Sequence, residues 1–235
     1  MAVVCILLLA GCTGGWTIFE DDLAVDGSEL EANAEMVDSY HFEVTRTLQS
    51  THVNETTTSD GVVDAEERRA HVTTTAEVEA STEPRVTEQY VDGDAQYTNG
   101  DDDWERVTGG DWNDTDLLTS ATASLEGATF EQVREETVNG VETTMFEVDM
   151  TEEAESELLG TDGSGHVPTS VEEYVYYVLV DTETDTLYGT DLRMEISQGG
   201  EPAFVTIETT FSAYGEDVDV SLPDDVREAA SDVED

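Results

Sequence analysis

The fold is decided by residues 174–180, which read Tyr-Val-Tyr-Tyr-Val-Leu-Val. This run is apolar on both faces of an extended chain and is rich in β-branched and aromatic residues, so it predicts a buried strand. Two more predicted strands follow at 187–196 and 204–213. In 204–213 apolar and polar residues alternate, which indicates a half-buried strand. The last third of the chain therefore predicts three neighbouring antiparallel strands.

Upstream of these strands the same period of two residues recurs. We expect strands at 40–48, 69–79, 86–91, 95–98, 104–107, 130–137 and 141–150. Asp92-Gly93, Asn99-Gly100 and Asn139-Gly140 mark tight hairpins between them, because such turns need positive φ. The helical spacing of apolar residues predicts short helices at 29–38, 116–125 and 151–159. The fold class is therefore mainly β with a few helices (α+β), in one domain over 28–223.

The charge of the chain excludes several classes of partner. Among 235 residues there are 57 Asp and Glu against 8 Arg and no Lys, for a formal net charge of −49. A basic patch for nucleic acid and a polybasic membrane face are thus excluded. At about 1 M salt the Debye length is roughly 3 Å, which screens the self-repulsion of such a surface. We interpret the composition as that of a protein from a salt-loving microbe, and expect an acidic disordered tail only at 224–235.

The N-terminal residues predict export and lipid anchoring. The apolar run at 3–10 is too short to span a bilayer and is typical of a signal peptide. Leu9-Ala10-Gly11-Cys12 resembles the lipobox of secreted lipoproteins, which implies cleavage before Cys12 and a lipid on its thiol. We therefore expect a signal peptide at 1–11, a tether at 12–27 and a location on the outer face of the cytoplasmic membrane. Since no basic residue precedes the run, we also expect a start codon upstream of Met1. The alternative interpretation of the apolar run is a buried strand that happens to contain Cys.

Neither a catalytic residue nor a metal or cofactor site is predicted. The only two cysteines, Cys5 and Cys12, both lie in the N-terminal segment, so the mature domain has no thiol. The four histidines lack ligand spacing, and the loop at 162–166 does not match G-x-S-x-G. The acidic segment at 92–103 has Tyr97 where a calcium loop needs glycine. We expect no enzymatic activity and no cofactor.

Two sequons in the expected domain predict N-glycosylation. Asn54 is followed by Glu-Thr and Asn113 by Asp-Thr, both matching the acceptor pattern. Because Thr is so common in this chain, a chance occurrence is the alternative for each.

The order of these elements resembles the lipoprotein carriers typified by LolA and the mycobacterial LppX group, and related haloarchaeal lipoproteins. The residues that carry the resemblance are Tyr90-Val91-Asp92-Gly93-Asp94-Ala95-Gln96-Tyr97, Trp104-Glu105-Arg106-Val107, Val180-Asp181 with Leu187, Phe211-Ser212-Ala213-Tyr214-Gly215, Val218-Asp219-Val220 and Leu222-Pro223. The resemblance covers 38–223. It implies an open antiparallel half-barrel sheet with short helices on its concave side, an apolar cavity for acyl chains, and no catalytic residues.

Two functions remain open from the sequence. The first is a non-enzymatic, membrane-anchored binder or carrier of a lipid or other hydrophobic ligand. The second is a surface-structural or protein-interaction domain of the cell envelope with a filled core; a lipoprotein hydrolase is a third and weaker reading. In the first case the expected cavity side chains are Tyr176, Val178, Met194, Val205, Ile207 and Phe211. We expect a monomer in either case.

Overall fold

The structure is a computed structural model, and it describes residues 25–79, 81–99, 103–110, 112, 115–158, 169–198, 200–229 and 231–232. Four short helices and twelve strands follow in the order α1 (Gly27–Ala34), β1 (Ser39–Ser50), β2 (Asn54–Asp64), β3 (Arg69–Val78), β4 (Arg85–Asp92), β5 (Ala95–Asn99), β6 (Trp104–Thr108), α2 (Leu117–Ala123), β7 (Thr129–Val138), β8 (Val141–Asp149), α3 (Glu152–Leu158), β9 (Thr169–Asp181), β10 (Thr186–Gln198), β11 (Glu201–Ser212), α4 (Asp224–Ala229) and β12 (Ser231–Asp232).

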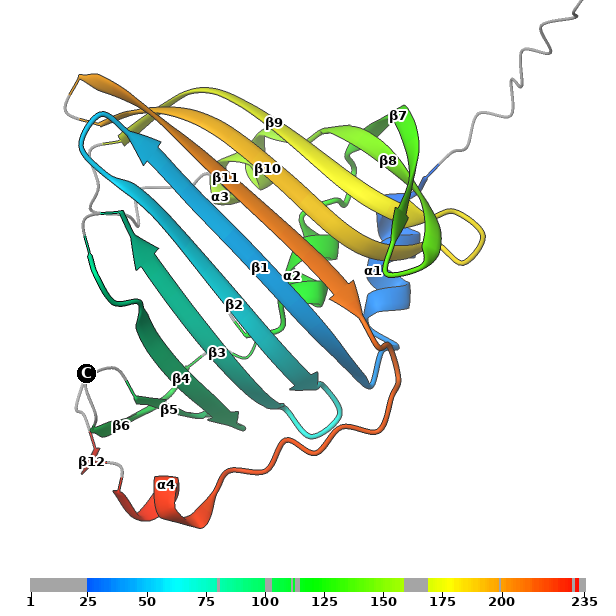
Figure 1. Ribbon diagram of the computed structural model, residues 1–235. Helices are drawn as coiled ribbons and strands as arrows, with labels where there is room; N and C mark the ends of the chain where they lie inside the picture. The colour runs from blue at the N-terminus through cyan, green and yellow to red at the C-terminus, as the bar shows by residue number, and fades with distance from the viewer. Residues whose placement is uncertain are drawn as a thin grey trace, which may run out of the picture.

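All twelve strands form one open sheet in the order β12-β6-β5-β4-β3-β2-β1-β11-β10-β9-β8-β7 (Figure 1). Every pairing is antiparallel except that of the two-residue β12 with β6. Strands adjacent in the sheet are also adjacent in sequence, with β1 and β11 as the exception within the antiparallel part. There the two halves of the chain meet, and Phe42 pairs with Phe211. The prediction of a mainly β fold with an open antiparallel sheet is confirmed.

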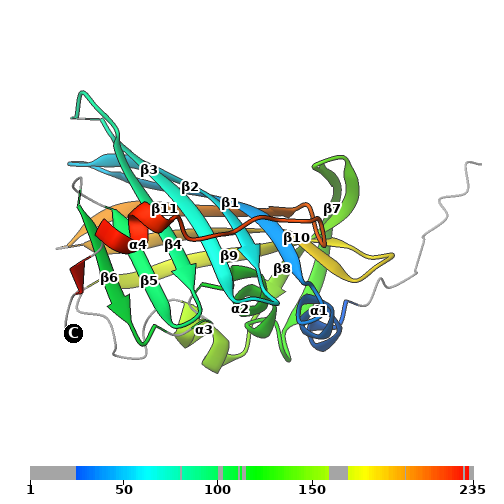
Figure 2. The same ribbon diagram turned by 90° about the horizontal axis from the view of Figure 1, so that it is seen from below.

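Helices α1, α2 and α3 lie on one side of the sheet, which Figure 2 shows beneath the strands. We call this side the concave face and the opposite side the convex face. Asp26 is the N-cap of helix α1, its carboxylate accepting from the Ser28 N–H, and the helix buries Leu30 and Ala34. Gly27 allows α1 to approach α2 closely, since a Cβ there would lie 2.0 Å from the carbonyl oxygen of Leu125.

The core lies between these helices and the concave face, where it extends from β4 through β1 and β11 to β8. Its fully buried members come from both layers and include Leu30, Tyr40, Leu118, Leu125, Phe146, Val178, Val180, Leu187 and Phe211. Short helices are sufficient here because each adds its few apolar side chains to this shared cluster. The expected helices at 29–38, 116–125 and 151–159 are thus all present, although each is shorter than expected.

Strand β2 is absent from the sequence-based prediction. Its sequence, Asn-Glu-Thr-Thr-Thr-Ser-Asp-Gly-Val-Val-Asp, contains an Asp-Gly pair and few apolar residues, which favours a turn locally. Pairing with β1 on one side and β3 on the other nevertheless places it in the middle of the sheet. Tertiary pairing overrides the local preference at this strand.

The C-terminal segment also differs from expectation. Residues 224–229 of the predicted disordered tail form α4, and 231–232 form β12. Val226 is buried, and Arg227 Nη2 lies 3.5 Å from Asp92 Oδ2 at the end of β4. These two anchors explain why an acidic segment folds against the sheet near β4–β6 (Figure 1).

Candidate functional site

A cleft of about 380 Å³ lies on the concave face of β1–β5, beside the segment that leads into α2. Its lining residues are Phe42, Val44, Ser59, Val72, Thr74, Gln89, Val91, Gly93, Asp94, Ala95, Gln96, Gly110, Trp112, Thr115 and Leu117. The cleft is therefore in the N-terminal half of the sheet, at a part of the core where Phe42 and Val91 are buried and Val44, Val72, Trp112 and Leu117 are only partly covered.

The strand register explains how the floor of the cleft is assembled. Phe42 of β1 pairs with Gly61 of β2, which in turn pairs with Val72 of β3. A Cβ at Gly61 would lie 2.2 Å from the Phe42 ring, so the ring rests on the glycine. In the next row, Val44 is followed by Ser59 and Thr74. The floor thus combines apolar side chains with small hydroxyls.

The wall of the cleft is formed by Trp112, Thr115 and Leu117, which precede or begin α2. A buried network holds this wall in place. The Tyr40 hydroxyl donates to Asp116 Oδ1 at 2.8 Å and accepts from the Leu118 N–H at 3.2 Å. Burial, together with the adjacent Asp116 charge, raises the pKa of Tyr40 well above its ordinary value. Strand β1 therefore positions both the floor and the wall.

The polar side chains that the structure describes in the lining are almost all uncharged. The Ser59 and Thr74 hydroxyls lie 2.8 Å apart, while Gln89, Gln96 and Thr115 add further hydrogen-bonding groups. Among the described residues of the lining, Asp94, which is exposed, is the only ionisable one. Apolar walls with a few uncharged polar groups suit an apolar or amphipathic small molecule.

The six side chains expected to line a cavity lie elsewhere on the concave face. Tyr176, Val178 and Phe211 belong to the buried core, and Met194 and Ile207 pack against it. Val205 is also buried, and it pairs with Met194 across β10 and β11. Burial raises the pKa of Tyr176 to about 12, although hydrogen bonds with Ser124 and Thr190 oppose this shift. The structure thus brings the six residues onto one face, and none of them lines the cleft.

The cleft residues escaped sequence analysis because their signal is spread over five strands. Phe42, Val44, Val72 and Val91 are inward positions of predicted strands, but each strand contributes only one or two of them. Without β2, the register that places Phe42 opposite Val72 cannot be deduced. Trp112 carried the clearest signal, as a large aromatic residue just before a predicted helix.

The remaining candidate residues divide by whether the structure describes them. Asn54 is exposed at the start of β2, where its amide donates to Glu79 Oε2 at 2.6 Å. Cys12, Asn113 and the loop at 162–166 lie outside the described residues. In the described part of the chain, His, Cys, Asp and Glu form no group of three that could hold a metal ion. Likewise, none of the helices within the ranges given above has the length and apolarity needed to cross a membrane.

Comparison with solved structures places this fold beside three bacterial proteins. LprF from Mycobacterium bovis matches with a TM-score of 0.51 at 18% identity, over 84% of this chain and 94% of that one. The lipoprotein LppX from Mycobacterium tuberculosis gives a TM-score of 0.49 at 15% identity, over 83% and 96%. A putative outer membrane lipoprotein-sorting protein domain from Vibrio parahaemolyticus gives 0.30 at 9% identity, over 83% and 93%.

At these identities the similarity shows a shared fold alone, and this conclusion rests on the match to LprF. No family model and no curated protein sequence matches the chain.

Proposed function

We propose that this protein is a non-enzymatic binder or carrier of a lipid or other hydrophobic ligand, held in the cleft on the concave face of β1–β5. The observation that carries the proposal is the cleft itself: about 380 Å³ lined by Phe42, Val72 and Trp112 among others, where the core leaves Val72 and Trp112 only partly buried. Binding of a ligand that removes this apolar surface from water is favoured by about 25 cal/mol for each Å² buried.

Membrane anchoring is part of the same proposal. We infer an extracytoplasmic lipoprotein attached to the outer face of the cytoplasmic membrane through a lipid on Cys12, because Leu9-Ala10-Gly11-Cys12 follows a short apolar run. The name of the structurally similar LppX, a lipoprotein, agrees with this inference. Cys12→Ser should release the protein from membranes or leave its precursor uncleaved. Fractionation identical to wild type would refute the anchor.

Ligand binding is tested with N-phenyl-1-naphthylamine, an uncharged dye that fluoresces in apolar sites, in molar salt. Val72→Phe fills the cleft and should weaken dye binding at least tenfold. Val86→Phe is the matched control, since Val86 lies on the neighbouring strand, is 55% exposed and points to the convex face. Absence of dye binding by the wild type, or equal binding by both variants, would contradict the proposal.

A surface-structural or interaction domain is the second candidate. It is favoured by the packed core, in which the side chains of Tyr176, Val178 and Phe211 are buried. Mass spectrometry of molecules that co-purify with the protein from its native host separates the two. A bound amphiphile supports the carrier, and a ligand-free protein that also fails to bind the dye supports the structural domain.

A further inference from the structure

We propose that the cleft selects amphipathic ligands with an anionic head group, and that Arg46 binds this head group at the end of the cleft. The inference rests on the proposed function and adds the chemistry of the ligand. It starts from the position of Arg46 on β1, two residues beyond Val44 of the cleft floor. Side chains alternate along a strand and rise about 3.4 Å per residue, so Arg46 is on the concave face about 7 Å past Val44.

The neighbours of Arg46 on this face do not neutralise it. Across β1 it pairs with Ile207 of β11 and Thr57 of β2, and Leu48 follows it on the same face. The carboxylate of Glu55, diagonal to it, accepts from the Thr57 hydroxyl at 3.4 Å. Arg46 is exposed, and within the described ranges its guanidinium has no ion-pair partner. The Arg46 guanidinium is therefore a cation next to a partly apolar surface.

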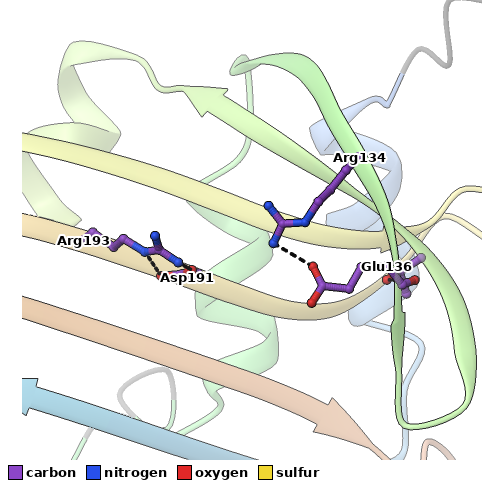
Figure 3. Close-up of polar contacts among 5 residues, drawn as sticks. Arg134, Glu136, Asp191 and Arg193 are labelled. Atoms are coloured by element: carbon purple, nitrogen blue, oxygen red, sulfur yellow. Dashed lines mark hydrogen bonds and ion pairs between the residues drawn. The ribbon is translucent and has the colours of Figure 1, made fainter.

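This arrangement differs from that of arginines elsewhere in the sheet. Arg193 grips its own-strand neighbour Asp191 with two contacts of 2.6 and 3.1 Å, and Arg134 Nη2 lies 2.9 Å from Glu136 Oε2 (Figure 3). Arg69 is held between Glu67 and Asp92. Arg46 differs in that both residues directly paired with it, Ile207 and Thr57, are uncharged, and its nearest carboxylate on this face is the diagonal Glu55.

A second arginine occupies the same row of the sheet. Thr57 pairs with Ala76 of β3, and Ala76 pairs with Arg85 of β4, so the row reads Arg46, Thr57, Ala76, Arg85. Three strand spacings of about 4.8 Å separate the two arginines, roughly 14 Å between their Cα atoms. Small side chains lie between them. Two long cationic side chains thus flank the end of the cleft from both sides.

The chemistry favours a carboxylate, sulfate or phosphate. A guanidinium presents parallel N–H donors that match two oxygens of such a group. The net charge of −49 repels anions over long distances, but at about 1 M salt that repulsion is screened beyond roughly 3 Å while direct contacts persist. With its chain among Phe42, Val44 and Val72, an amphiphile would place its head at Arg46.

The test compares octanoate with octanol, which share chain length and differ in head group, as competitors of N-phenyl-1-naphthylamine in molar salt. We expect octanoate to displace the dye at about three- to tenfold lower concentration, the range for exposed charge-assisted contacts. Arg46→Gln should remove this advantage and leave displacement by octanol unchanged. Arg46→Lys should retain part of it, and Arg134→Gln, on β7, should retain all of it.

Inorganic phosphate distinguishes two sources of the anion. If millimolar phosphate cancels the octanoate advantage, the site also takes a free anion; if it has no effect, recognition requires the attached chain. Equal displacement by octanoate and octanol, or an advantage that survives Arg46→Gln, would overturn the head-group inference alone. Failure of the dye to bind the wild type would overturn the proposed function and this inference with it.

Discussion

The hydroxyl of Tyr40 donates a 2.8 Å hydrogen bond to Asp116 Oδ1, which joins the first strand to the N-terminal cap of α2. Asp116 also accepts from the Thr119 N–H and hydroxyl, so one buried carboxylate fixes both the helix end and its docking on β1. The wall of the cleft depends on this contact, because Trp112, Thr115 and Leu117 lie directly around Asp116 in sequence.

Tyr40→Phe removes the hydroxyl, so the buried Leu118 N–H loses its acceptor and Asp116 Oδ1 keeps only the Thr119 N–H as a donor. We expect a loss of about 1–3 kcal/mol in the free energy of unfolding, the cost of an unsatisfied buried group. Urea unfolding measures it. Tyr90→Phe is the control, since the Tyr90 hydroxyl donates to the partly exposed Glu88 and its loss should cost less. Equal losses in the two variants would show that the Tyr40 contact has no special role.

Gly61→Ala should destabilise the sheet, because its Cβ would lie 2.2 Å from the Phe42 ring. We expect about 1–3 kcal/mol, as for other overpacked sites. Phe42→Leu removes the ring and should make Gly61→Ala less destabilising. The double variant should therefore lose less unfolding free energy than the sum of the two single losses. Strict additivity in this cycle would refute direct contact as the cause.

Stability should fall at alkaline pH through the buried tyrosines. The folded pKa of Tyr176, about 12, exceeds the unfolded value of 10.0, so its neutral form favours folding fully below pH 10. That contribution is lost as the pH rises through 12, at up to about 1.4 kcal/mol per pH unit. Tyr176→Phe should flatten the dependence of unfolding free energy on pH between 10 and 12. An unchanged slope would contradict this assignment.

Folding should require salt. With 57 acidic and 8 basic residues, the folded chain concentrates repulsion that the unfolded chain relieves by expanding. Circular dichroism in molar salt should show the β spectrum, and dialysis to low salt should abolish it reversibly. Sucrose at matched osmolarity is the control for general exclusion effects. A spectrum and melting temperature independent of salt would disprove the prediction.

How far the sequence predicts this fold depends on local apolar patterning. Strands β9 and β11 are evident from the run at 174–180 and the alternation at 204–213, and α1 from Leu30 and Ala34. Strand β2 is not, since its residues carry little strand preference and are held by partners on both sides. The position of the apolar face was predictable, whereas which of its side chains are fully covered depends on where the helices dock.

The candidate site shows the same limit more strongly. Tyr176 and Phe211 were expected beside a ligand because their strands are the most apolar, yet both are buried in the core beneath the helices. The weaker pattern of β1–β5 leaves the cleft. Arg46 is conspicuous only once β2 and β11 are known to place Thr57 and Ile207 beside it.

The meeting of β1 and β11 also has a consequence for the order of folding. Every other antiparallel pair in the sheet joins strands that are consecutive in sequence, through short hairpins except between β8 and β9, where α3 intervenes, so β1–β6 and β7–β11 can each assemble from nearby segments. The pairing of Phe42 with Phe211 instead closes a loop of about 170 residues, whose entropic cost is met only when both halves are already ordered. We therefore expect this seam to form last, and to limit the rate at which the whole sheet assembles.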